Sequence, residues 1–164
     1  DPSHPASYFC YGLPVLAPAD GTVVEAPEGC PDAPVALDGR LRVGGDDIRG
    51  NHVVIEHAHG EFSCLAHLAA GSVAVRTGEA VACGQPVGRC GSSGASTEPH
   101  LHFHVQKGRS FYSSPGVPVR FADVCAEPAP NYAAADPRPI PEGAHGAFPP
   151  FLVRGMRVRN VGRA

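Results

Sequence analysis

Short segments in which apolar and polar residues alternate recur along the first two thirds of the chain. Residues 51–57 and 61–67 are two of them, separated by the three residues 58–60, and residues 99–105 alternate most regularly of all. A period of two over this length is typical of half-buried β-strands. Because the loop between the first two segments is short, we expect them to pair as an antiparallel hairpin.

Further short apolar segments separated by turn residues occupy residues 14–18, 21–25, 75–81 and 81–88. No stretch shows a convincing helical period. The 20 glycines and 18 prolines also favour turns over long helices. The sequence therefore predicts an all-β fold: a small antiparallel sheet or barrel-sandwich with little or no helix.

Two stretches interrupt this pattern. Residues 26–50 are rich in Pro, Gly and Asp and are too long for a hairpin loop, so we expect an insertion that folds over one face. Residues 126–150 contain seven prolines and are predicted to be a linker or extended arm, followed by an edge strand within 151–161. The expected organisation is a ragged start at 1–7, a β domain at 8–125 and a Pro-rich extension at 126–164.

Charge and composition exclude some classes of function. The formal net charge of −3 lacks the basic excess of a nucleic-acid-binding domain, and no apolar run approaches the roughly 18 residues of a membrane span. Six cysteines suit an oxidising compartment, yet reduced, half-buried thiols are an equal alternative. Cys83 and Cys90 flank a predicted hairpin and could lie on facing strands.

Histidine is the compositional outlier, with nine residues. His100, His102 and His104 alternate with Leu101, Phe103 and Val105, so on a strand the imidazoles share one face while the apolar side chains face the core. Residues i and i+2 are roughly 7 Å apart, which lets one ring bind a metal while its neighbour reaches a metal-bound water. The alternative is a solvent-facing polar stripe.

Two neighbouring features are ambiguous by themselves. His67 lies in the apolar run 65–68, where a lone histidine is more often a buried core residue than a functional one. The Gly- and Ser-rich run 91–99 leads into the histidine strand, and two successive turns explain it better than a phosphate-binding loop, since no helical pattern follows.

Together these segments resemble the lysostaphin/LytM-type zinc peptidases, metallopeptidase family 23, over about residues 8–121. The resemblance rests on runs at 13–24, 50–57, 65–68, 71–73, 78–81, 84–88 and 91–103. It implies cleavage of peptide cross-links in bacterial peptidoglycan, and hence a place in the cell envelope or outside the cell. It implies Zn²⁺ as cofactor with His102 as a ligand. It also implies that His67 and His100 flank the attacking water and the scissile carbonyl, and it gives His104 no catalytic role.

The chain departs from the family pattern at its start. The family takes two more zinc ligands, a His and an Asp, from an upstream H-x-x-x-D-type motif. Here only Asp1 and His4 could correspond, and they occur in the reverse order. We therefore expect this chain to lack two zinc ligands and to be incomplete as an enzyme.

Three alternatives remain. The first is a degenerate, non-catalytic LytM-like module that binds and activates another wall hydrolase; the intact His67, His100 and His102 argue against it. The second is a biotinyl or lipoyl carrier domain, which needs a lysine at a hairpin tip, whereas the only lysine here is Lys107. The third, a sugar-phosphotransfer protein, rests on fold analogy alone. The sequence does not indicate an oligomeric state.

Overall fold

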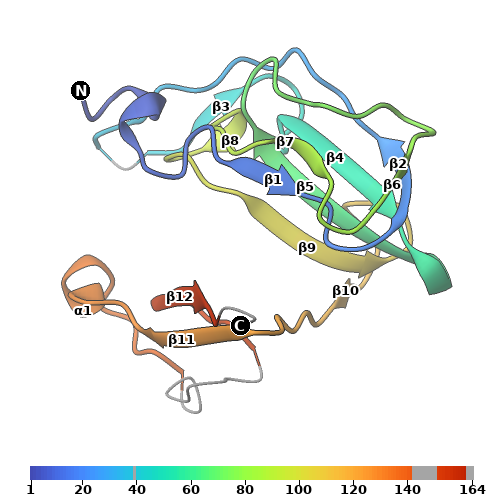
Figure 1. Cartoon of the computed structure of the whole chain (residues 1–164). Coiled ribbons are helices and arrows are strands. Elements are labelled where there is room, and N and C mark those ends of the chain that lie inside the picture. Colours follow the sequence, from blue (N-terminus) through green and yellow to red (C-terminus); the bar gives the residue numbers. More distant parts are fainter. Residues whose placement is uncertain (39, 142–150, 162–164) are drawn as a thin grey trace. The chain divides into compact units, whose positions relative to one another are not determined.

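The computed structural model describes residues 1–38, 40–141 and 151–161 (Figure 1). They form two compact units, Asp1–Val117 and Pro118–Ala164. Within the described ranges, no helix has the length and apolar character needed to cross a membrane.

The first unit is built on a six-stranded antiparallel sheet. Its strand order is β10 (Gly116–Val117), β9 (His102–Lys107), β5 (Glu61–Leu68), β4 (Asn51–Glu56), β2 (Gly21–Glu25) and β6 (Ala80–Val81). Strands β4 and β5 form the predicted hairpin, joined by the short 3-10 turn η2 (Ala58–Gly60). The all-β prediction is confirmed.

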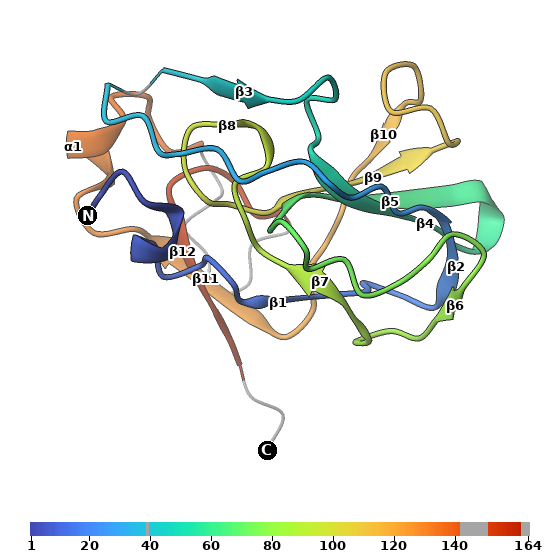
Figure 2. The same ribbon diagram turned by 90° about the horizontal axis from the view of Figure 1, so that it is seen from above.

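Two smaller antiparallel pairs complete this unit. Strand β1 (Pro14–Leu16) pairs with β7 (Pro86–Arg89), and β3 (Arg42–Gly44) pairs with β8 (Gly94–Ser96). The 3-10 turn η1 (Pro5–Ser7) precedes β1. In Figure 2 the β1–β7 pair and the β3–β8 pair lie on opposite sides of the sheet. Residues 26–50, expected to be an insertion, thus contribute a strand of their own, and Ala33 and Val35 within them are buried.

The main hydrophobic core packs β4 and β5 against the β1–β7 pair. It joins Val53, Ile55 and Leu65 of the sheet to Val15 of β1 and Val87 of β7. Because successive strand residues point to opposite faces, the residues between these belong to the other face. There a second, smaller apolar cluster contains Val54, Phe62, Cys64 and Ala66.

The β5–β9 register assigns the histidines to this second face. Ala66 lies opposite His102, Cys64 opposite His104, and Phe62 opposite Gln106. Residues directly opposite each other in an antiparallel pair share a face. The ladder therefore places His102, His104 and Gln106 in one row, away from the main core.

One detail of the histidine strand was predicted wrongly. Strand β9 begins at His102, so His100 and Leu101 lie in the preceding loop, and His100 forms only an isolated bridge with Gly91. Leu101 is 39 % exposed and does not enter the core, whereas Phe103 packs against it as expected. The row of side chains on this face of the ladder therefore runs from His102 through His104 to Gln106 and does not include His100.

The second unit contains a two-stranded antiparallel sheet of β11 (Val124–Pro128) and β12 (Met156–Asn160), with the four-residue helix α1 (Tyr132–Ala135) between them in sequence. Strand β12 lies in the segment predicted as an edge strand. Residues 142–150, part of the predicted Pro-rich arm, lie outside the described residues.

All six cysteines are free thiols in this structure. The exposed Cys83 lies in the turn before β7, where its thiol contacts the Pro18 carbonyl oxygen at 3.4 Å, while the buried Cys90 forms an isolated bridge with Leu68. Cys83 and Cys90 therefore do not lie on facing strands, as the sequence suggested they could.

Candidate active site

The three predicted site residues come together at one end of the β5–β9 ladder. His67 is the next-to-last residue of β5, His102 is the first of β9, and His100 precedes it by two residues. The His67 ring centroid lies 4.6 Å from that of His100 and 5.9 Å from that of His102. Residues 33 and 35 positions apart in sequence thus form one imidazole cluster.

Backbone hydrogen bonds through Gly91 couple His67 to His100. The Gly91 N–H donates to the His67 carbonyl at 3.0 Å, and the Gly91 carbonyl accepts from the His100 N–H at 3.2 Å. A Cβ at Gly91 would collide with the Ala69 backbone and come within 2.7 Å of Asp32. Glycine at this position is what allows the loop 91–99 to pass so close to the end of β5.

His67 itself adopts a left-handed backbone conformation, with φ of 62°. Such a conformation is uncommon for non-glycine residues, although His tolerates it better than most. The His67 N–H donates to the Arg49 carbonyl at 2.9 Å, so both sides of its backbone are held. The left-handed turn ends the regular run of β5 and is part of what brings this ring close to His100.

Hydrogen bonds to backbone carbonyls fix the tautomers of two of the rings. His67 Nδ1 lies 2.9 Å from the Ser93 carbonyl oxygen, and His100 Nδ1 lies 2.8 Å from that of Glu98. A carbonyl oxygen only accepts, so each Nδ1 carries the proton and donates it. In the neutral rings, Nε2 therefore keeps its lone pair and can accept a proton or bind an electrophile.

Burial favours the neutral form of two of the rings. It lowers the pKa of His67, and the neighbouring His100 and His52 rings lower it further against an opposing hydrogen bond to Ser93. Burial likewise lowers the pKa of His102, with added repulsion from His104, His67 and His100. Both rings are therefore available as bases or ligands at neutral pH.

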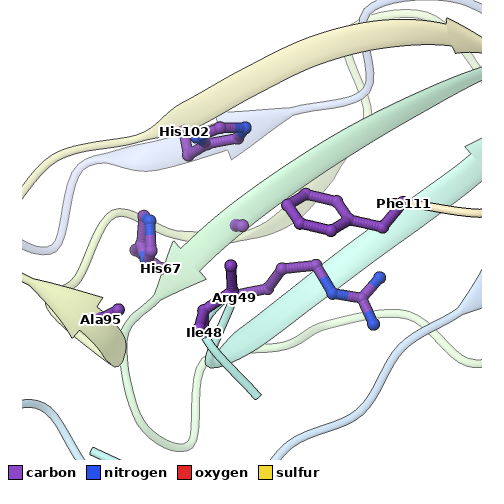
Figure 3. A pocket seen from close by; sticks show the side chains of 7 residues that line it. Ile48, Arg49, His67, Ala95, His102 and Phe111 are labelled. Carbon is purple, nitrogen blue, oxygen red and sulfur yellow. The ribbon is translucent and has the colours of Figure 1, made fainter. Parts of the chain in front are cut away.

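A pocket of about 110 Å³ opens in front of these rings. Figure 3 shows His67 and His102 at one end and Phe111 at the other, with the Arg49 side chain along the floor. The lining is completed by small and aliphatic side chains, namely Ile48, Ala66 and Ala95. The cavity is thus apolar except for the imidazoles and one guanidinium.

The Arg49 guanidinium is held by carboxylates. Its Nη2 lies 2.8 Å from Asp47 Oδ2, its Nη1 lies 3.0 Å from Glu25 Oε2, and it sits 5.0 Å from the centroid of the Phe111 ring. The hydrogen bond from Arg49 lowers the pKa of the Asp47 carboxyl. Neither Arg49 nor Phe111 was predicted as a site residue, since each lies in a loop whose residues follow no period. The closely spaced opposite charges at 46–49 were the one available signal.

The described residues do not complete a metal site. A catalytic zinc needs three protein ligands plus water. Within 1–38, 40–141 and 151–161, no group of three or more His, Cys, Asp or Glu side chains is placed to hold a metal ion. The Asp1 carboxylate bonds to Ser3, and His4 Nδ1 accepts from the Ala6 N–H. His102 thus remains one candidate nitrogen ligand in a cluster that would need further donors.

Comparison with known proteins gives consistent matches. The sequence profile of Peptidase family M23 matches residues 8–114. The DD-carboxypeptidase/endopeptidase Mpg of Neisseria meningitidis serogroup B is 37% identical over 125 residues, which cover 76% of this chain and 23% of that protein. The cell division protein DipM of Caulobacter vibrioides is 35% identical over 89 residues, or 53% of this chain and 14% of that protein. The chain therefore spans less than a quarter of the length of these relatives.

Among solved structures, the catalytic domain of lysostaphin from Staphylococcus simulans matches with 27% identity and a TM-score of 0.49, over 66% of this chain and 70% of that one. The assignment rests on the profile, which covers more than half of the chain and includes all three rings of the imidazole cluster. It confirms the resemblance found in the sequence, and the chain belongs to peptidase family M23.

Proposed function

We propose that this chain is the catalytic region of an endopeptidase that hydrolyses peptide cross-links of bacterial peptidoglycan. The observation that carries the proposal is the His67–His100 pair, with ring centroids 4.6 Å apart and both Nδ1 atoms bound to backbone carbonyls. Family membership and relatives named as endopeptidases, such as Peptidoglycan DD-endopeptidase ShyA of Vibrio cholerae, support the substrate class. Such a substrate lies outside the cytoplasm, so we expect the protein in the envelope or outside the cell.

The pair suits the two proton transfers of amide hydrolysis. One group must take a proton from the attacking water, and one must stabilise the oxyanion or give a proton to the leaving nitrogen. Positive charges on two rings this close repel each other, and His100 indeed lowers the pKa of His67. The pair therefore disfavours two positive charges at once, which leaves a neutral ring able to act as the base while its neighbour stabilises the oxyanion or gives a proton to the leaving nitrogen.

His102 is the proposed zinc ligand. A bound zinc would lower the pKa of its water toward 7 and polarise the scissile carbonyl. The remaining ligands must come from donors other than those the described residues bring together.

The proposal is tested by digesting cross-linked muropeptides with the 164-residue chain and with a version extended upstream, followed by mass spectrometry of the products. Zinc per chain is measured on the same samples. We expect cleavage and about one zinc per chain in the extended version, and loss of both with His102→Ala. Intact cross-links in both versions, together with binding of a wall hydrolase, would favour the non-catalytic alternative.

Matched variants isolate the role of His67. His67→Asn keeps a side chain that tolerates the left-handed backbone and removes the imidazole. His59→Asn is the control, because His59 has nearly the same φ, 63°, but is exposed at the η2 turn. We expect a loss of about 10²–10⁴-fold in kcat for His67→Asn and little change for His59→Asn. Equal activity of the two variants would refute a catalytic role for His67.

A further inference from the structure

A chain of side-chain hydrogen bonds runs along β9 away from the imidazole cluster. His102 Nε2 lies 2.9 Å from His104 Nδ1, and His104 Nε2 lies 2.8 Å from Gln106 Oε1. The Gln106 amide nitrogen then donates to the Gly108 carbonyl oxygen at 2.9 Å. The four residues occupy alternate positions, so the chain follows the period of the strand.

The last bond sets the direction of all the others. The Gly108 carbonyl can only accept, so it must face the amide nitrogen of Gln106, and the Gln106 oxygen faces His104. That oxygen also only accepts, so His104 Nε2 carries the proton. A neutral His104 then has a lone pair at Nδ1, which accepts from His102 Nε2–H. The lone pair of neutral His102 is therefore at Nδ1.

The surroundings support this single direction. Gln106 is 3 % exposed, so its amide has little water to exchange partners with. Phe62 lies opposite Gln106 in the ladder, Cys64 lies opposite His104, and the Phe111 ring centroid is 5.5 Å from that of His104. Reversing the chain would turn the buried Gln106 oxygen toward the Gly108 oxygen and leave two acceptors facing each other.

We propose that His104 and Gln106 are positioning residues that hold His102 as the Nε2–H tautomer, with Nδ1 as its metal-binding atom. The part that concerns metal rests on the proposed function; the tautomer depends only on this chain. A ligand imidazole must present an unprotonated nitrogen, and partners of its other nitrogen usually decide which one that is. Here the deciding group is the Gly108 backbone carbonyl. It fixes the orientation of the Gln106 amide, which fixes the tautomer of His104, which in turn fixes that of His102.

The tautomers can be read in the metal-free 164-residue chain by ¹⁵N NMR of the histidine side chains at pH 8. We expect His102 and His104 each to show a protonated Nε2 and an unprotonated Nδ1. A ¹⁵N–¹⁵N coupling through the hydrogen bond should join His102 Nε2 to His104 Nδ1. A proton on His102 Nδ1, or no such coupling, would overturn the proposal whether or not the protein cleaves peptidoglycan.

Two substitutions separate positioning from general packing. In His104→Glu a carboxylate can still accept from His102 Nε2–H, so the His102 tautomer should persist. In His104→Leu the acceptor is lost, so His102 should exchange between its two tautomers and show averaged ¹⁵N shifts for Nδ1 and Nε2. The backbone amide spectrum of the same sample shows whether the variant is folded. Gln106→Leu is a second variant, which should remove the fixed tautomer of His104 in the same way. A single Nε2–H tautomer of His102 in a folded His104→Leu chain would contradict the proposal.

Metal affinity gives an independent readout in the upstream-extended version. Loss of a partner that orients a ligand typically weakens metal binding by about 10–100-fold. We expect this range for zinc in His104→Leu and a change of only a few-fold in His104→Glu. Equal zinc affinity of His104→Leu and the unmodified protein would exclude the positioning role even if the tautomers are as described.

Discussion

Ser92 and Ser93 are adjacent and both are almost completely buried, but only the Ser93 hydroxyl is hydrogen-bonded within the described residues. The Ser93 hydroxyl donates to the Leu68 carbonyl at 2.6 Å and accepts from the Asn51 N–H at 3.0 Å. The Ser92 hydroxyl has no hydrogen-bond partner among the described residues. The Ser93 side chain thus joins the start of β4 to the end of β5. The backbone carbonyl of the same residue accepts the hydrogen bond from His67 Nδ1.

The substitution Ser93→Ala should be strongly destabilising. It leaves the Asn51 N–H buried without an acceptor, which costs about 1–3 kcal/mol, and it removes a second bond worth about 1 kcal/mol. The Leu68 carbonyl keeps a hydrogen bond from the Asn51 side chain at 3.1 Å, so it is not orphaned. The expected loss in the free energy of unfolding is therefore about 2–4 kcal/mol.

The substitution Ser92→Ala should not lower the free energy of unfolding. It removes a buried hydroxyl that is not hydrogen-bonded, so stability should stay level or rise by up to about 1 kcal/mol. Urea denaturation followed through amide resonances of β4 and β5 measures both variants without contributions from the second unit. Equal urea midpoints for the two variants would refute the conclusion that the Ser93 hydroxyl is hydrogen-bonded and the Ser92 hydroxyl is not.

Two further predictions concern loop geometry and pH. Gly94→Ala should lower the free energy of unfolding by about 1–3 kcal/mol more than Gly71→Ala, as measured by thermal unfolding. Both positions have φ near +75°, but only at Gly94 would a Cβ meet backbone atoms, such as the Ile48 oxygen at 2.6 Å. Arg49 holds the pKa of Asp47 below its unfolded value, so this pair stabilises the fold above about pH 4 and loses its effect as pH falls through the folded pKa. Asp47→Asn should flatten the acid limb of the stability curve relative to the exposed control Asp38→Asn; identical acid limbs would contradict the pairing.

The strands were predictable where one face of the sheet is buried. Residues 51–57 and 61–67 carry the alternating pattern because the β1–β7 pair covers one face, and the three residues between them permit only a tight turn. The start of β9 was less predictable. Leu101 continues the alternation in sequence, but the bridge between Gly91 and His100 holds the chain out of the ladder there.

The site was only partly predictable. The period of a strand indicated that His102 and His104 share a face, whereas His67 could be named only through the family resemblance. Its proximity to His100 depends on a left-handed turn and a glycine contact that no periodicity encodes. Arg49 and Phe111 reach the pocket from loops, and the role of Gln106 depends on a carbonyl two residues beyond it.

The most direct test of the central claim is hydrolysis of cross-linked peptidoglycan in ¹⁸O-labelled water by the upstream-extended protein. The account predicts that released peptides carry one ¹⁸O atom in each newly formed carboxyl group. It also predicts that His67→Asn slows this incorporation by about 10²–10⁴-fold while His59→Asn leaves its rate unchanged. Incorporation by His67→Asn at the rate of the unmodified protein, or intact cross-links with the unmodified, zinc-loaded protein, would contradict it.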